Sequence, residues 1–339
     1  MPKSDRKHKP RNMAEQVRRL LTLFTPEDRV LITIAADPDA LGSALAFKRL
    51  LWRRVAGVTI ARHNEITRPD NLAMVRLLKI PLESLKQLRI DDFSKRVMVD
   101  SQPHHSKDFE RIPQHVIIDH HPVGDSAEKT PFVDIRPRYG ATSSILTEYL
   151  RAARIKPSTR LATALVYGIK NDTAGFQRPA LAEDVAALQF LFPKANQALL
   201  RNIEFSEMRL KDLEVLRQAL GEYVVRRHGI FVHLGACKSP DNLVQIADFF
   251  LKVDSVDFTA ASGTHHDNLV IVMRNMGARM SAGVMAQRAF GDLGPAGGHK
   301  AMARAELPLK ALKERLGDVK DATLKDFVIS RLLRRPQKR

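Results

Sequence analysis

The sequence predicts an α/β protein in which a parallel-sheet domain is joined by a helical connector to a smaller α/β domain. Short apolar runs alternate with helical patterns in the first half of the chain, as in βαβ units. A mostly helical stretch follows, and strand-like and helical segments then alternate again. We expect a basic disordered arm (residues 1–12), a first domain (13–195), a helical connector (196–221), a second domain (222–330) and a basic tail (331–339).

The first domain opens with a helical pattern over residues 13–24, where apolar residues fall on one face. Residues 30–35 form a short β-branched run of the kind that is buried in parallel sheets. Residues 41–52 return to helical spacing, and three further apolar runs cover residues 58–61, 97–99 and 116–118. This alternation predicts a parallel sheet that binds its ligand at the carboxyl ends of the strands.

The second half predicts helices over residues 185–191 and 197–220, and then a change of pattern. Residues 223–226, 229–234, 258–262 and 269–273 have the composition of strands, and helices are expected over residues 241–250 and 281–290. A second α/β domain accounts for this order.

Composition limits the setting of the protein. The formal net charge of +17 raises the local concentration of polyanions such as nucleic acids and nucleotides, although a generally basic proteome or solvated helix faces explain it equally well. The single cysteine, Cys237, excludes an intrachain disulfide framework and a Cys-rich zinc site. No run approaches the ~18 apolar residues of a membrane span, and no apolar signal-peptide core follows Met1, so a cytoplasmic protein without a membrane partner is expected.

Acidic and histidine residues follow three of the four apolar runs of the first domain. Asp37 and Asp39 come after the first run, Asp100 after the third, and residues 119–121 (Asp-His-His) after the fourth. Asp172 follows another apolar stretch. A parallel sheet would bring these ends together, and carboxylates with imidazoles suit Mn²⁺ or Mg²⁺. Two such ions, about 3.5–4 Å apart, can promote attack of water on a phosphoester.

Each of these residues also has a plainer interpretation. Asp37 or Asp39 alone reads as the N-cap of the next helix, a His-His pair is commonly a surface pair, and Asp172 fits an ordinary turn. Their order at successive strand ends favours a shared metal site over three unrelated coincidences.

Five segments of the first domain follow one another as a series of motifs: residues 37–43 (Asp-Pro-Asp-Ala-Leu-Gly-Ser), Asp100, 119–121 (Asp-His-His), 140–144 (Gly-Ala-Thr-Ser-Ser) and 172–176 (Asp-Thr-Ala-Gly-Phe). This series resembles the DHH phosphoesterase superfamily. In the second domain, residues 297–299 (Gly-Gly-His) and Arg274 resemble the DHH-associated substrate-binding domain. The resemblance covers roughly residues 28–308.

The resemblance implies a role for each matching residue. Two Mn²⁺ or Mg²⁺ ions would be held by Asp37, Asp39, Asp100, His120 and Asp172, with Asp100 bridging them. His121 would touch the scissile phosphate or orient the attacking water, and Asp119 would orient a histidine. Arg274 and His299 would hold the substrate's terminal phosphate, and the backbone of Gly297 and Gly298 would approach it closely. The plainer interpretations are that Arg274 is a surface arginine and that the two glycines form a turn.

The chain departs from the family pattern in two places. Thr33 stands where the first motif has a histidine, so the first metal site should be weaker unless His104 or His105, or water, replaces the missing ligand. The glycine-rich motif is also altered, with Ala296 before Gly297 and residues 302–304 (Met-Ala-Arg) after it.

The implied activity is that of the nanoRNase and pAp-phosphatase branch, a hydrolase of short RNA or DNA oligonucleotides or of nucleotides such as pAp. Two alternatives stay open. One is a cyclic dinucleotide phosphodiesterase, and the other is a nucleotide-binding or RNA-binding module with a site weakened by Thr33. Whether the chain forms a homodimer is also left open.

Overall fold

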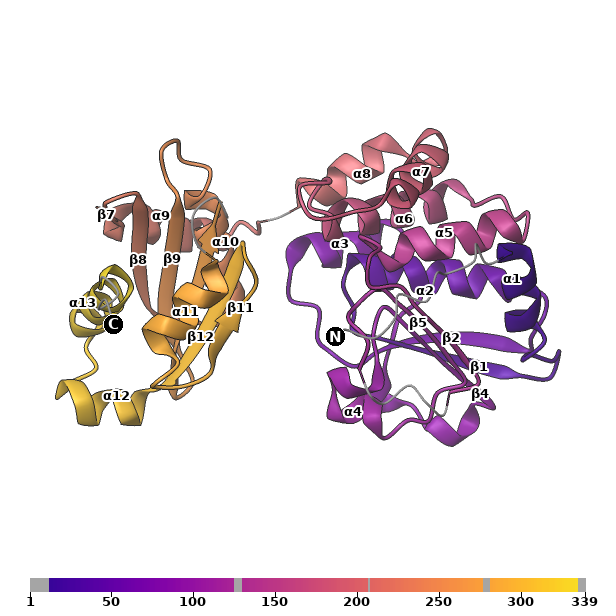
Figure 1. Cartoon of the computed structure of the whole chain (residues 1–339), viewed down its shortest axis with the longest axis horizontal. Coiled ribbons are helices and arrows are strands. Elements are labelled where there is room, and N and C mark those ends of the chain that lie inside the picture. The colour runs from indigo at the N-terminus through magenta and orange to yellow at the C-terminus, as the bar shows by residue number, and fades with distance from the viewer. Residues whose placement is uncertain (1–11, 125–129, 207, 277–280, 335–339) are drawn as a thin grey trace, which may run out of the picture. The chain divides into compact units, whose positions relative to one another are not determined.

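The computed structural model describes residues 12–124, 130–206, 208–276 and 281–334. The chain divides into two compact units, Met1–Glu207 and Met208–Arg339. Within the described residues, each unit is built on a six-stranded sheet with helices packed on it (Figure 1). The predicted α/β class is therefore confirmed, with a parallel sheet in the first unit and a mixed sheet in the second.

The sheet of the first unit has the order β3-β2-β1-β4-β5-β6, and every neighbouring pair is parallel. Its strands are β1 (Arg29–Ile34), β2 (Gly57–Arg62), β3 (Glu83–Ser84), β4 (Lys95–Val99), β5 (Val116–Asp119) and β6 (Phe132–Ile135). The strand order reverses direction between β1 and β4. At such a switch point the connections leave in opposite directions, which opens a crevice at the carboxyl ends of the two strands.

Helices cover both faces of this sheet. They are α1 (Met13–Leu21), α2 (Pro38–Leu50), α3 (Pro69–Leu77), α4 (Lys107–Glu110), α5 (Thr142–Ala152), α6 (Thr159–Asp172), α7 (Ala182–Leu191) and α8 (Gln197–Glu204). Short 3₁₀ turns, η1 (Leu85–Gln87), η2 (Ile90–Asp92), η3 (Pro103–His105) and η5 (Phe192–Lys194), complete the unit.

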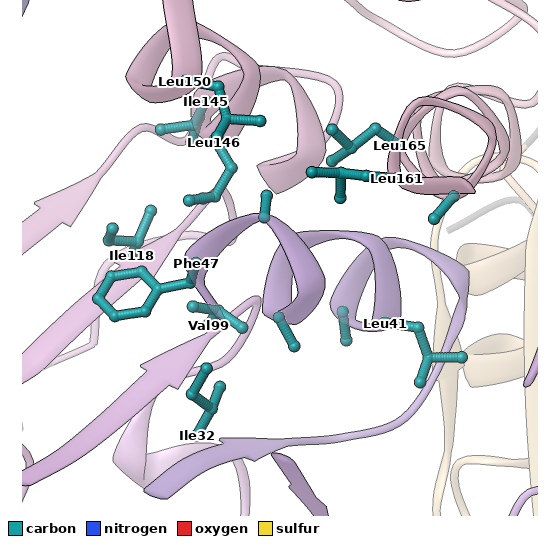
Figure 2. Close-up of a cluster of buried hydrophobic side chains, with 14 of the residues drawn as sticks. Ile32, Leu41, Phe47, Val99, Ile118, Ile145, Leu146, Leu150, Leu161 and Leu165 are labelled. Carbon is teal, nitrogen blue, oxygen red and sulfur yellow. The ribbon is translucent and has the colours of Figure 1, made fainter. Parts of the chain in front are cut away.

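Side chains alternate between two hydrophobic cores along the central strands. Ile32, Val99 and Ile118 point to the face covered by α2, α5 and α6, where they meet side chains such as Phe47 and Leu146 (Figure 2). The neighbouring residues Leu31, Met98 and Ile117 point to the other face and pack with Phe93 and Phe109. Because both faces are buried, these strands are continuously apolar, which explains why they were visible in the sequence.

The second unit has the strand order β11-β12-β10-β9-β8-β7, in which the β8–β9 pair is parallel and the other four neighbouring pairs are antiparallel. Its strands are β7 (Val224–Arg226), β8 (Gly229–Ala236), β9 (Phe258–His265), β10 (Asn268–Asn275), β11 (Ala296–Gly298) and β12 (Met302–Pro308). Its helices are α9 (Asp212–Glu222), α10 (Asp241–Phe250), α11 (Ala282–Phe290), α12 (Leu309–Leu316) and α13 (Asp321–Leu333). One sheet face packs against α11 and α13, and the other packs against α9 and α10.

Some segments differ from the sequence-based expectation. The stretch expected as a helical connector forms two helices, α8 in the first unit and α9 in the second. Residues 331–333, assigned to the basic tail, form the last turn of α13. The basic arm lies outside the described residues except for Asn12, which caps α1. Within the described part of the chain, no helix is long and apolar enough to cross a membrane.

Candidate metal centre

Four of the predicted site residues converge at the switch point of the first sheet. Asp39, Asp100, His120 and Asp172 each offer one ligand atom, and these atoms all lie within 4.8 Å of one another. Asp100 and His120 also belong to a second such group, which His121 completes. The structure therefore brings together residues that are up to 133 positions apart in the sequence. The charge of Asp172 contributes to the raised pKa of Asp37, but Asp37 belongs to neither group of ligand atoms.

The first turn of α2 holds Asp37 and Asp39 in different ways. Asp37 is the N-cap, and its Oδ1 accepts a hydrogen bond from the backbone N of Ala40 at 2.9 Å. Asp39 is fully buried and accepts hydrogen bonds from the backbone N atoms of Thr142 (2.6 Å) and Ser143 (2.7 Å). Its carboxylate thus caps α5, whose own N-cap residue, Ala141, offers no capping side chain. The positive end of a helix stabilises a carboxylate in this position.

Asp100 is held in an uncommon backbone conformation directly after β4. Its φ is 57°, in the left-handed region that few residues other than glycine adopt. The backbone N of Asp100 donates to the Ile118 carbonyl at 2.9 Å, and the hydroxyl of Thr142 donates to Oδ1 at 2.8 Å. Strain of this kind persists where the surroundings fix a functional side chain.

His120 presents a buried ring nitrogen to the carboxylates. Its Nδ1 lies 3.1 Å from the carbonyl oxygen of Tyr139, which assigns a proton to Nδ1, so Nε2 carries the lone pair when the ring is neutral. Nε2 is buried, 3.1 Å from Asp172 Oδ2 and 3.6 Å from Asp100 Oδ1, so the protonated ring forms an ion pair with Asp172. In the neutral ring, Nε2 has no hydrogen-bond donor among the described residues, and a metal ion is a suitable partner for its lone pair.

Asp172 reaches the centre from a helix, whereas the sequence suggested the end of a strand. It is the last residue of α6, which packs closely on α2. A Cβ atom on Gly168 would lie 3.0 Å from Asp39 Cα and 3.1 Å from the Pro38 carbonyl oxygen. The absence of a side chain at Gly168 therefore lets α6 approach the first turn of α2 and brings Asp172 to Asp39.

His121 is oriented by two buried residues. Its Nδ1 lies 2.8 Å from Asp119 Oδ1, and the Nε2 of Gln102 donates to Asp119 Oδ2 at 2.6 Å. The sequence suggested an orienting role for Asp119, and this geometry fits that role. Gln102 was not identified from the sequence, because a glutamine two residues after Asp100 carries no distinguishing signal.

The electrostatics of the cluster favour a bound cation. Burial and the nearby charge of Asp172 raise the pKa of Asp37 to about 7 and that of Asp39 to about 6. Burial, with the neighbouring carboxylates, also raises the pKa of Asp100 well above its usual value. Burial alone would lower the pKa of His120, but contact with Asp172 and the charge of Asp39 outweigh it and raise this pKa to about 9. Without metal, bound protons therefore neutralise part of the negative charge of the carboxylates, and a divalent ion would take their place. The oxygen and imidazole donors of this cluster suit Mn²⁺ or Mg²⁺.

The residues expected to bind substrate gather at one end of the second unit's sheet. Arg274 lies opposite Met302 where β10 pairs with β12, and its Nε donates to Asp248 Oδ1 at 2.6 Å. The exposed His299 is three residues before Met302, and its backbone N donates to the Met302 carbonyl at 2.8 Å. Gly297 has open space where a Cβ would stand, whereas Gly298 has φ +149° and lies against the backbone of Met302 and Ala303. Of the two glycines, Gly297 is therefore the one whose backbone a ligand can approach.

The order and geometry of these residues agree with the comparison to known families. Residues 29–169 match the family model described as the DHH family, N-terminal domain. These residues belong to the DHH family. For the first domain, the resemblance inferred from the motifs is confirmed, and this DHH domain contains β1 to β6 together with most of the candidate ligands.

Relatives extend the match beyond the DHH domain. An uncharacterised protein of Methanocaldococcus jannaschii is 34% identical over 285 residues, which is 84% of this chain and 58% of that protein, so the chain spans less than two thirds of this relative. An exopolyphosphatase-related protein from Bacteroides fragilis has a TM-score of 0.71 at 14% identity, covering 96% of this chain and 98% of its own. The exonuclease RecJ bound to manganese has a TM-score of 0.53 at 13% identity, covering 94% of each chain. At such identities the two structures establish a common fold.

The DHH domain departs from the family pattern at Thr33, as noted from the sequence. Thr33 is fully buried in β1, and its hydroxyl donates to the Val97 carbonyl at 3.3 Å. Neither His104 nor His105 belongs to the two ligand groups found among the described residues. His105 instead packs against the His121 ring, with 5.2 Å between the ring centroids. The structure thus gives no support to the expectation that one of these histidines replaces the missing ligand.

Proposed function

We propose that this protein is a metal-dependent phosphoesterase that hydrolyses short oligonucleotides or small phosphorylated nucleotides such as pAp. The observation that carries the proposal is the convergence of Asp39, Asp100 and Asp172 on the buried Nε2 of His120. Three carboxylates and one imidazole at a switch point form a site for a hard divalent cation. The DHH family match and the likeness of fold to RecJ bound to manganese support the same conclusion.

In this proposal, different residues of the DHH domain bind the metal ions and face the phosphate. Asp39, Asp100, His120 and Asp172 would hold one Mn²⁺ or Mg²⁺ ion, and Asp37 with Asp100 would hold a second, weaker one. Bound divalent ions supply Lewis acidity that favours water attack and neutralises phosphoryl oxygens. His121 faces the scissile phosphate, oriented by Asp119 through the 2.8 Å contact. In the second unit, Arg274 and His299 would bind a terminal phosphate, and Gly297 would admit it close to the backbone.

One assay tests the proposal against its competitors. The purified protein is incubated with Mn²⁺ and, separately, with pAp, dinucleotides, cyclic di-AMP and bis-p-nitrophenyl phosphate. We expect product from pAp or the dinucleotides. Faster turnover of cyclic di-AMP would favour a cyclic dinucleotide phosphodiesterase instead. Binding without product would favour the nucleotide-binding or RNA-binding alternative, which the replacement of a histidine by Thr33 supports.

The vacancy at Thr33 predicts two unequal metal sites. Calorimetric titration with Mn²⁺ should show one tight and one weak binding step, because the hydroxyl of Thr33 is engaged with Val97 and offers no imidazole. In Thr33→His, the weak step should tighten and the hydrolytic rate should rise. The same titration of Thr33→Val, which keeps the shape and removes the hydroxyl, should match the wild type. Two equally tight steps in the wild-type protein would contradict the prediction.

Metal binding should also strengthen as pH rises. The raised pKa values of about 6 for Asp39, 7 for Asp37 and 9 for His120 mean that part of the cluster is protonated near neutral pH without metal. A divalent ion displaces these protons, so raising the pH from 6 to 9 removes its competitor. Titrations in buffers of different ionisation enthalpy should reveal proton release on Mn²⁺ binding at neutral pH. Affinity that is independent of pH over this range would argue against the assigned ligands.

A further inference from the structure

Gln102 occupies a central position behind the candidate metal centre. It follows β4, only two residues after Asp100, and its side chain is fully buried. Its amide nitrogen donates to Asp119 Oδ2 at 2.6 Å and to the Pro122 carbonyl at 2.9 Å. Its amide oxygen accepts from the backbone N of Gly124 at 2.9 Å. The Gln102 side chain thus hydrogen-bonds Asp119, the first residue of the Asp-His-His segment, and also Pro122 and Gly124, which follow the segment.

The carboxylate of Asp119 depends on this contact for its orientation. Its Oδ1 accepts from the backbone N of His120 at 2.8 Å and lies 2.8 Å from His121 Nδ1. Oδ2 has Gln102 as its side-chain donor. If that donor were lost, the carboxylate would turn to regain a partner for Oδ2, because a buried oxygen without a hydrogen bond is unfavourable. Turning would weaken the bond that fixes His121.

We propose that Gln102 is a positioning residue that acts through Asp119 to hold the His121 ring with its proton on Nδ1 and its Nε2 directed at the metal-binding group. Mutating a residue that orients a metal-site histidine typically lowers metal affinity or activity by about 10–100-fold. Gln102 extends this relay by one residue, from the imidazole through the carboxylate to a neutral amide. The inference rests on the proposed hydrolytic function only for its kinetic consequence.

The variant Gln102→Met removes the amide and keeps a similar shape. Gln114→Met is the matched control, because Gln114 is also buried, but among the described residues its side chain bonds only the Ile112 carbonyl, and it precedes the opposite end of β5. With Mn²⁺ and bis-p-nitrophenyl phosphate, Gln102→Met should lower kcat by about 10–100-fold with little change in KM. Gln114→Met should retain wild-type values.

A double-mutant cycle separates positioning from general destabilisation. If Gln102 acts through His121, Gln102→Met should cause no further loss in a His121→Ala background, since residues that act as a unit are not additive. Two independent losses that multiply would overturn the proposal. Should Gln102→Met fail to fold, Gln102→Asn, which retracts the amide by one methylene group, takes its place in the cycle.

Nitrogen NMR of the imidazole rings provides a readout that needs no turnover. In metal-free protein at alkaline pH, the wild-type His121 signals should show the tautomer protonated at Nδ1, and Gln102→Met should show a mixture of tautomers. Gln114→Met should match the wild type. Unchanged tautomers in Gln102→Met would refute the inference even if the enzyme is active. If the wild type hydrolyses none of the substrates, the proposed function fails, while these spectra still decide the role of Gln102.

Discussion

Replacing Asp100 by asparagine is expected to lower the hydrolysis of bis-p-nitrophenyl phosphate by about 10³-fold or more, which corresponds to ~4 kcal/mol of lost transition-state stabilisation. Asp100 and His120 are the two residues shared by both ligand groups among the described residues. The variant loses the charge that would hold the cation, so Mn²⁺ affinity measured by calorimetry should fall together with kcat. Turnover retained at saturating Mn²⁺ would rule out the assigned role.

Asparagine is the informative substitute at this position because it preserves the local structure. It tolerates the left-handed conformation that Asp100 adopts at φ 57°, and its Oδ1 can still accept the hydroxyl of Thr142. The raised pKa of Asp100 means that the charged carboxylate is less favourable in the fold than in the unfolded chain, so its charge destabilises the metal-free fold at neutral pH. The melting temperature of metal-free Asp100→Asn should therefore be equal to or above that of the wild type. Asp91→Asn, at an exposed residue of η2, is the control for activity.

In the first sheet, the strands that the sequence predicts most clearly are the central ones, which are buried on both faces. Val97 and Ile118, for example, lie in short continuous apolar runs, and such runs were recognised at β1, β2, β4 and β5. The strands β3 and β6 at the edges of the first sheet were missed. β3 has two residues, and β6 is interrupted by Asp134, whose carboxylate pairs with Arg136. A polar residue in so short a run hides the strand pattern.

The candidate ligands can be predicted from the sequence because their residue types and order are informative. The contacts that hold these side chains in place cannot be predicted in this way. Asp172 follows the apolar residues of α6, and a short apolar run does not distinguish a buried helix from a strand. The capping of α5 by Asp39 joins residues more than 100 positions apart, and the Gln102–Asp119 bond joins residues 17 apart. No local propensity encodes such contacts, because they exist only once the helices and strands have packed.

The largest loss of stability in the first unit is expected from Gly168→Val. The new side chain would begin 3.0 Å from Asp39 Cα and 3.1 Å from the Pro38 carbonyl oxygen, both of which are backbone atoms that cannot rotate away. Because α2 and α6 must separate to admit it, we expect the free energy of unfolding to fall by about 3 kcal/mol, at the upper end of overpacking effects. Separation would also draw Asp172 away from Asp39, so Mn²⁺ affinity should decrease even at temperatures where the variant is folded. Denaturant unfolding and calorimetric titration measure the two effects.

Gly221→Ala is the matched control, because Gly221 also lies in a helix, α9, but a Cβ there would meet nothing within 4 Å. Alanine is favoured over glycine in helices by up to ~1 kcal/mol, so this variant should be neutral or slightly stabilised and should bind Mn²⁺ normally. A Gly168→Val protein as stable as Gly221→Ala would show that α2 and α6 do not need their close approach. The position of Asp172 in the metal centre would then require another explanation, since the contact at Gly168 is what places the end of α6 beside the first turn of α2.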